Sequence, residues 1–140
     1  MSNNKIFYDV YNQIGHIADS LGAMLEGCTK NDIYMIESNL KFVKVCIAKL
    51  EENYITPLSY EVAYINNINR NEMTEQEERD YNYLIKAYKN IKLLKLDKIN
   101  HVTPRKNKLS VNEKLSNRMA INNYKNIAKF SEAQMKRLEV

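Results

Sequence analysis

The sequence predicts an all-α protein, a helical bundle of four to five helices built on an N-terminal antiparallel αα-hairpin, with a basic C-terminal helix. Two observations lead to this prediction. Apolar residues recur every three or four positions along most of the 140-residue chain, as they do on one side of an α-helix. The chain has only three Gly and two Pro, which leaves little material for the many turns of a β-sandwich or barrel.

The first 54 residues have the most regular pattern, and they predict the hairpin. One stripe of apolar residues predicts a helix over residues 5–26 that ends at Gly27, because Gly adopts a left-handed cap at least cost. Thr29 with Asp32 is then expected to cap a second helix. Two such helices joined by a short turn must fold back on each other. The two stripes are Phe7, Val10, Ile14, Ile17, Leu21 and Met24, then Ile33, Ile36, Leu40, Val43, Ile47, Leu50 and Tyr54.

Two further helices are expected in the middle of the chain. Thr56 can cap a third helix with Pro57 at its first position, where proline is tolerated. Thr74 with Glu77 forms a capping box, which predicts a fourth helix over residues 75–96 or beyond. The Asn-rich stretch between these helices is expected to form a loop. The apolar stripe of the third helix is Leu58, Val62, Ile65 and Ile68.

The C-terminal segment is expected to be the least firmly attached. Proline disfavours helical geometry in the residue before it, so residues 104–108 are predicted to form a linker. Ser110 with Glu113 predicts a last helix that reaches Leu138, but its apolar residues are sparse. We therefore divide the chain into a helical bundle core, residues 1–102, and a basic linker and helix, residues 103–140, which belongs to the same domain or forms a mobile arm.

The sequence shows no pattern of a catalytic or metal-binding site. Cys28 and Cys46 are predicted to be free thiols, because about 14 residues of helix would hold them about 20 Å apart. Free thiols are typical of a reducing compartment, here the cytoplasm. No phosphate-binding loop, nucleophile motif or zinc-ligand spacing is present. We expect no enzyme and no cofactor, and no apolar run that would cross a membrane.

Positive charge is concentrated at the C-terminal end. Residues 1–102 hold 12 Lys and Arg against 14 Asp and Glu, whereas residues 103–140 hold 9 against 3, so their net charges are −2 and +6. Such a segment can neutralise phosphates, and one interpretation is a nucleic-acid-binding accessory protein. Its candidate contacts are Arg105, Lys106, Lys108, Lys114, Arg118, Lys125 and Lys129.

The interpretation that we favour is a non-enzymatic interaction protein: an adaptor, an assembly factor or an inhibitor of a larger machine. Basic helix faces are commonly exposed to solvent without binding a nucleic acid. Apolar stripes with 3.5-residue spacing pack well on other helices, including those of further copies of the same chain. A protein partner and a homo-oligomer are therefore expected. The abundant Asn, Ile, Lys and Tyr have AT-rich codons, which indicates an AT-rich genome such as that of a phage, a mobile element or a low-GC bacterium. The candidate partner contacts are Met119, Ile127 and Met135.

Overall fold

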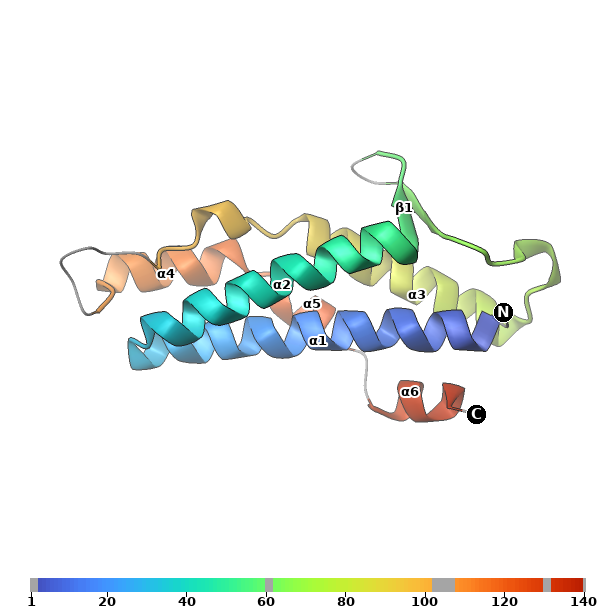
Figure 1. Ribbon diagram of the computed structural model, residues 1–140, viewed down its shortest axis with the longest axis horizontal. Helices are drawn as coiled ribbons and strands as arrows, with labels where there is room; N and C mark the ends of the chain where they lie inside the picture. Colours follow the sequence, from blue (N-terminus) through green and yellow to red (C-terminus); the bar gives the residue numbers. More distant parts are fainter. Residues whose placement is uncertain (1–2, 60–61, 102–107, 130–131, 140) are drawn as a thin grey trace.

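The chain is mostly helical, which confirms the predicted class apart from one small sheet (Figure 1). The computed structural model describes residues 3–59, 62–101, 108–129 and 132–139. The helices are α1 (Asn3–Lys30), α2 (Ile33–Asn53), α3 (Glu75–Lys92), α4 (Val111–Ala120), α5 (Tyr124–Ile127) and α6 (Glu132–Leu138). The strands are β1 (Ile55–Pro57) and β2 (Ala63–Ile65), and two 3₁₀-helices are η1 (Arg70–Glu72) and η2 (Leu96–Lys98).

The predicted antiparallel hairpin is formed by α1 and α2, which lie side by side along the length of the molecule (Figure 1). All six residues of the first predicted stripe are buried. In the second stripe Ile33, Ile47 and Tyr54 are partly buried and the other four residues are fully buried. The regular spacing of both stripes therefore places them face to face in the core.

The end of α1 differs from the prediction. The helix continues past Gly27 to Lys30, and Asn31 adopts the left-handed conformation with a φ of 56°. The amide of Asn31 donates to the carbonyl of Cys28 at 3.4 Å, and that of Asp32 donates to the carbonyl of Gly27 at 2.8 Å. These are the two hydrogen bonds of a Schellman motif, in which Asn can replace the more usual Gly.

The N-cap of α2 also differs from the prediction, because it lies three positions later in the chain. Asp32, not Thr29, is the N-cap, and its Oδ1 accepts a hydrogen bond from the amide of Met35 at 2.9 Å. Gly27 serves close packing instead of a cap, because a Cβ at this position would lie 2.9 Å from Cγ1 of Ile36. The turn is thus tight enough to bring the two helices into contact at their junction.

The predicted third helix is wrong, because β1 and β2 form an antiparallel β-hairpin there. Ile55 pairs with Ile65, and both side chains are buried, whereas Leu58 and Val62 are exposed. The amide of Ile65 donates to the hydroxyl of Tyr81 at 3.2 Å, which ties the hairpin to α3. β-branched residues suit a half-buried strand, and packing of the two isoleucines against the core decides the conformation.

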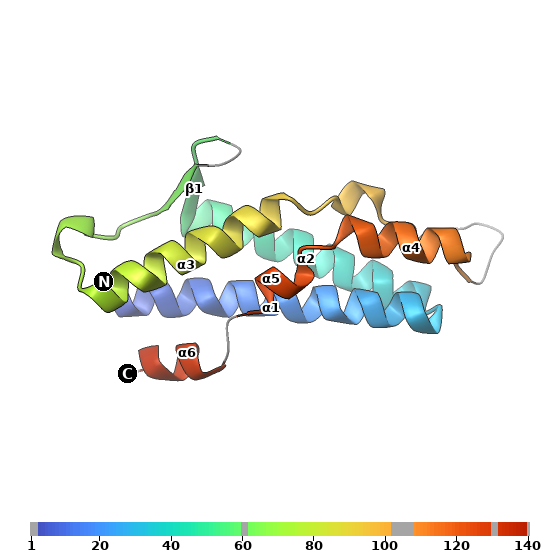
Figure 2. The same cartoon turned by 180° about the vertical axis from the view of Figure 1, so that it is seen from behind.

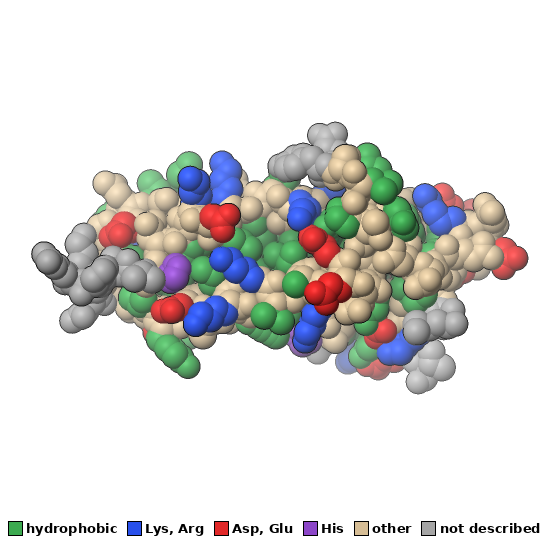
Figure 3. Space-filling model, turned by 45° about the horizontal axis from the view of Figure 1, so that its top comes forward, with side chains coloured by type: hydrophobic (Ala, Val, Ile, Leu, Met, Phe, Trp, Pro, Cys, Tyr) green, Lys and Arg blue, Asp and Glu red, His purple; other side chains and the backbone are tan. Residues whose placement is uncertain are grey.

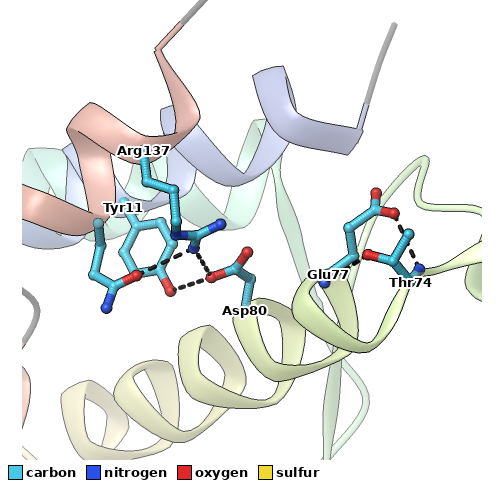
Figure 4. A network of polar contacts seen from close by, with 6 residues as sticks. Tyr11, Thr74, Glu77, Asp80 and Arg137 are labelled. Carbon is cyan, nitrogen blue, oxygen red and sulfur yellow. Dashed lines mark hydrogen bonds and ion pairs between the residues drawn. The ribbon is translucent and has the colours of Figure 1, made fainter.

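Both remaining capping boxes are formed as predicted. The Oγ atom of Thr74 accepts from the amide of Glu77 at 3.2 Å, and the amide of Thr74 donates to the carboxylate of Glu77 at 3.1 Å (Figure 4). Ser110 and Glu113 make the same pair of bonds at the start of α4. Helix α3 ends at Lys92, which is short of the predicted residue 96.

The single C-terminal helix predicted up to Leu138 is wrong, because the segment is divided into α4, α5 and α6 (Figure 2). The residues between α4 and α5 include Asn122 and Asn123, and asparagine favours turns. Four buried residues place the described part of this segment on the same core as α1–α3, namely Ala120, Ile121, Ile127 and Leu138. The predicted linker, with Arg105 and Lys106, falls outside the described residues except for Lys108.

A buried carboxylate connects α6 to α1 and α3. Asp80 of α3 is 2% exposed, and its Oδ1 accepts hydrogen bonds from the hydroxyl of Tyr11 at 3.0 Å and from Nη2 of Arg137 at 2.5 Å. Figure 4 shows the three side chains converging from three helices. A buried charge is tolerated where it is paired and hydrogen-bonded, so this group fixes the position of α6.

The raised pKa values of Tyr11 and Tyr88 predict that the fold loses stability at alkaline pH. Burial and the Asp80 carboxylate raise the pKa of Tyr11, and burial and the hydrogen bond to Glu51 raise the pKa of Tyr88, both from an ordinary value near 10. Because the folded-state pKa is raised, the contribution of each neutral hydroxyl is fully present below pH ~10 and is lost as pH rises from there through the folded pKa. Denaturant unfolding should therefore give a free energy of unfolding that falls above pH ~10.

The variant Tyr11→Phe provides the control for this titration. It lacks the raised pKa of Tyr11, so its free energy of unfolding should fall less steeply above pH ~10 than that of the wild type. Lysines also lose their charge in this range, but they do so equally in both proteins. Identical slopes for the two proteins would contradict the assignment.

Cys28 and Cys46 are both buried and free, as predicted. Each lies on its own helix of the hairpin, and the sulfur of Cys28 accepts a hydrogen bond from Nδ2 of Asn117 at 3.4 Å.

Over the part of the chain that the structure describes, no helix combines the length and the apolar character needed to cross a bilayer.

Candidate interaction surface

Helix α4 presents three large apolar side chains on its exposed side. Val111, Leu115 and Met119 are 81%, 54% and 65% exposed. They are four positions apart, and at roughly 100° per residue each step turns the helix by only about 40° beyond one full turn. The three side chains therefore form one continuous row, which we call the α4 stripe.

The opposite side of α4 is held in place by a buried asparagine. Asn117 is fully buried, its Oδ1 accepts from the amide of Asn100 at 2.7 Å, and its Nδ2 donates to the carbonyl of Asn100 at 3.0 Å. The carbonyl of Ala120 accepts from the amide of Lys95 at 2.9 Å. Turning α4 to bury the stripe would leave these polar groups without partners, which is costly. The exposure of the stripe is thus built into the fold.

Positive charge borders the α4 stripe on one side. Arg118 donates from Nη2 to Oγ1 of Thr29 at 3.3 Å, which holds the guanidinium over the end of α1. Lys114 lies one turn earlier and forms no ion pair with a described residue. The other border consists of the neutral residues Asn112 and Ser116. A complementary surface would therefore be apolar in the middle and acidic along one edge.

The structure places the three predicted partner contacts in different environments. Met119 belongs to the α4 stripe, and Met135 of α6 is partly buried against the core. Ile127 is fully buried in the core of its own chain, so it is not part of this exposed surface, and its contact with a partner stays a prediction. Sequence reasoning singled out Met119 but not Val111 or Leu115. Their four-residue spacing was visible, but an apolar stripe on a helix normally faces inward.

The predicted nucleic-acid contacts do not form one track in the described residues. Arg118 contacts α1 near its C-terminal end, whereas Lys129 follows α5 and lines a groove with residues of α3. Figure 2 shows α4 at one end of the molecule and α5 near its middle. On the face shown in Figure 3, acidic and basic side chains are interspersed. Of the other predicted contacts, Lys108 and Lys125 are exposed, Lys114 is partly buried, and Arg105 and Lys106 lie outside the described residues.

Neither the metal-ligating side chains of the described residues nor the comparisons with known proteins indicate a function. Within the described ranges, no three His, Cys, Asp or Glu side chains come together in a group that could hold a metal ion. No protein-family model matches the chain, and searches of curated proteins and of solved structures found no match either. The functional conclusion therefore depends on the surface of the chain itself.

Proposed function

We propose that this chain is a non-enzymatic interaction protein that binds a helical segment of a partner protein on the α4 stripe. The observation that supports this proposal is the exposure of Val111, Leu115 and Met119 on a helix whose other side is anchored. Adjacent exposed apolar side chains with a polar border are typical of protein–protein contact sites. An amphipathic helix can lay its apolar side along such a row, and burial of the three side chains supplies the affinity.

The border of the stripe indicates the charge of the partner. Lys114 and Arg118 lie along one edge, and Glu113, the one acid of α4, is engaged with Ser110 in the capping box. A partner helix with carboxylates along its matching edge would meet these cations without a like-charge contact. The partner is therefore expected to be an amphipathic helix with an acidic flank.

A second copy of the chain fits the stripe less well. Two copies related by a two-fold axis with antiparallel α4 helices would bring Lys114 and Arg118 against the same residues of the other copy. Like charges in direct opposition are destabilising, and the chain already carries a net charge of +4. We therefore propose a different protein as the partner and treat self-association as an outcome of the test.

Replacing Leu115 and Met119 by Ser should weaken binding of the partner by about 30-fold or more. Each truncation removes an apolar anchor that contributes of the order of 1–2 kcal/mol in an interface of this type. Val45→Ser on α2 is the matched control, because Val45 is 51% exposed and Leu115 is 54% exposed. Calorimetry with the partner recovered by the wild-type chain measures the affinities, and thermal unfolding verifies that both variants are folded.

The alternative function, nucleic-acid binding by the basic segment, predicts the opposite effects of these substitutions on binding. Gln in place of Lys108, Lys114 and Arg118 would then abolish binding of DNA or RNA, and the affinity of the wild type would fall steeply with salt. The Ser variants of the stripe would bind nucleic acid normally. For the proposed protein partner, the same Gln changes should alter association rate and salt dependence more than affinity.

A further inference from the structure

A groove lies between α3 and α5, away from the α4 stripe. The groove has a volume of about 310 Å³ and is lined by Tyr83, Lys86, Ala87 and Asn90 of α3, Asn126 of α5, and Lys129. Sites for small molecules begin at about 300 Å³, which accommodates a ligand of the size of a mononucleotide. From this groove we infer a binding site for a phosphate-bearing ligand of mononucleotide size.

The charge of the groove selects an anion. Lys86 and Lys129 reach it from two different segments, and neither forms an ion pair with a described residue. Among the described residues that line the groove, none is a carboxylate. Two lysines in one concave site repel each other, and a bound anion removes this repulsion and gains two charge-assisted contacts.

The remaining lining residues suit the non-phosphate part of a nucleotide. Asn90 donates from Nδ2 to the carbonyl of Lys86 at 3.0 Å, which orients the amide and leaves its Oδ1 as an acceptor. Asn126 supplies a further amide, and an amide group can pair with the donor and acceptor edge of a nucleobase. Tyr83 and Ala87 add an aromatic ring and an apolar surface against which a base can pack.

The position of the groove explains how the fold creates it. Helix α5 packs on α1, since the hydroxyl of Tyr124 lies close enough to Gly22 that a Cβ there would be 2.9 Å away. The same short helix contacts α3, as Figure 2 shows, so Lys129 is brought beside Lys86 from 43 positions further along the chain. The site thus requires the turn that separates α4 from α5.

Adenosine monophosphate is a suitable probe, with adenosine as its uncharged counterpart. Calorimetry or NMR titration should show saturable binding of adenosine monophosphate and binding of adenosine that is at least tenfold weaker. Inorganic phosphate should compete with adenosine monophosphate for the groove. Lys86→Gln combined with Lys129→Gln should lower the affinity for adenosine monophosphate at least tenfold, because both cations that contact the phosphate are removed.

The matched control changes one lysine of α3 and one of α5, both outside the groove. Lys89→Gln with Lys125→Gln removes the same net charge, and both residues are exposed, so affinity should stay within about twofold of the wild type. Thermal unfolding confirms that both double variants keep the fold. No saturable binding at millimolar nucleotide, equal binding of adenosine, or an equal loss in the control would overturn the proposal.

A free nucleotide and the phosphorylated end of a nucleic acid strand share the chemistry that the groove recognises. A short single-stranded oligonucleotide with and without a 5′-phosphate separates the two sources. Tighter binding of the phosphorylated strand than of adenosine monophosphate, lost in the Lys86 and Lys129 variant, identifies a strand end. Binding of the nucleotide alone identifies a free nucleotide.

Discussion

Replacement of Ile14 or Leu40 by Asp should lower the free energy of unfolding by about 4 kcal/mol or more. Ile14 of α1 is 0% exposed and Leu40 of α2 is 4% exposed, and both lie in the seam between the two helices. A carboxylate at either position would be buried among apolar side chains with no cation to pair with. Since a domain of this size is stable by only 5–15 kcal/mol, roughly, either variant should be close to unfolding at room temperature.

Lys41→Asp is the control for the hairpin, because it adds the same carboxylate one position away on the exposed side of α2. It removes an ion pair with Glu37 at 3.8 Å and places two acids four positions apart, which together should cost less than about 1 kcal/mol. Denaturant unfolding followed by circular dichroism measures all three variants. Equal tolerance of Asp at the three positions would mean that the two seams do not face each other.

Removal of the Arg137 guanidinium should have the second largest effect, about 3 kcal/mol. Arg137→Met keeps an unbranched apolar side chain but leaves the carboxylate of Asp80, which is 2% exposed, with only the hydroxyl of Tyr11 at 3.0 Å as a hydrogen-bond donor among the described residues. A buried charge without its counter-charge is strongly destabilising. Amide hydrogen exchange should show the loss first in α6, which Arg137 holds against α3.

Two further variants, one at the neighbouring Lys136 and one at Asp80, separate the effect of the lost Arg137 charge from other effects of the substitution. Lys136→Met lies on the same helix and is exposed, so it should cost less than about 0.5 kcal/mol. Asp80→Asn added to Arg137→Met should recover part of the lost stability, because a neutral amide needs no counter-charge. Equal costs for Arg137→Met and Lys136→Met, or no recovery in the double variant, would contradict the role assigned to this ion pair.

The sequence predicted those elements whose signals are local. The seams of α1 and α2 repeat over five or six turns, and the capping boxes at Thr74 and Ser110 depend on residues three positions apart. The hairpin of β1 and β2 escaped prediction because Leu58, Val62 and Ile65 also fit helical spacing. Strand preference depends on what a segment packs against, and here that is the core and the hydroxyl of Tyr81.

The two candidate surfaces, the α4 stripe and the groove, depend on contacts that sequence spacing does not reveal. The side of α4 that faces inward is set by Asn117, whose partners Asn100 and Cys28 lie 17 and 89 positions away. A buried asparagine is uncommon, so the spacing alone did not indicate that the apolar row faces away from the core. The groove between α3 and α5 likewise requires a break after Ala120, which a continuous last helix would have excluded.

A photo-reactive benzophenone side chain at position 115 tests most directly whether α4 docks a partner protein. Irradiation in the native cells should give a covalent adduct with one other protein, and mass spectrometry should place the attachment in an amphipathic helix with an acidic flank. The same side chain at position 45, which is equally exposed on α2, should give no such adduct. Equal labelling from both positions, no adduct at position 115, or an adduct with a second copy of the chain would contradict the proposed function.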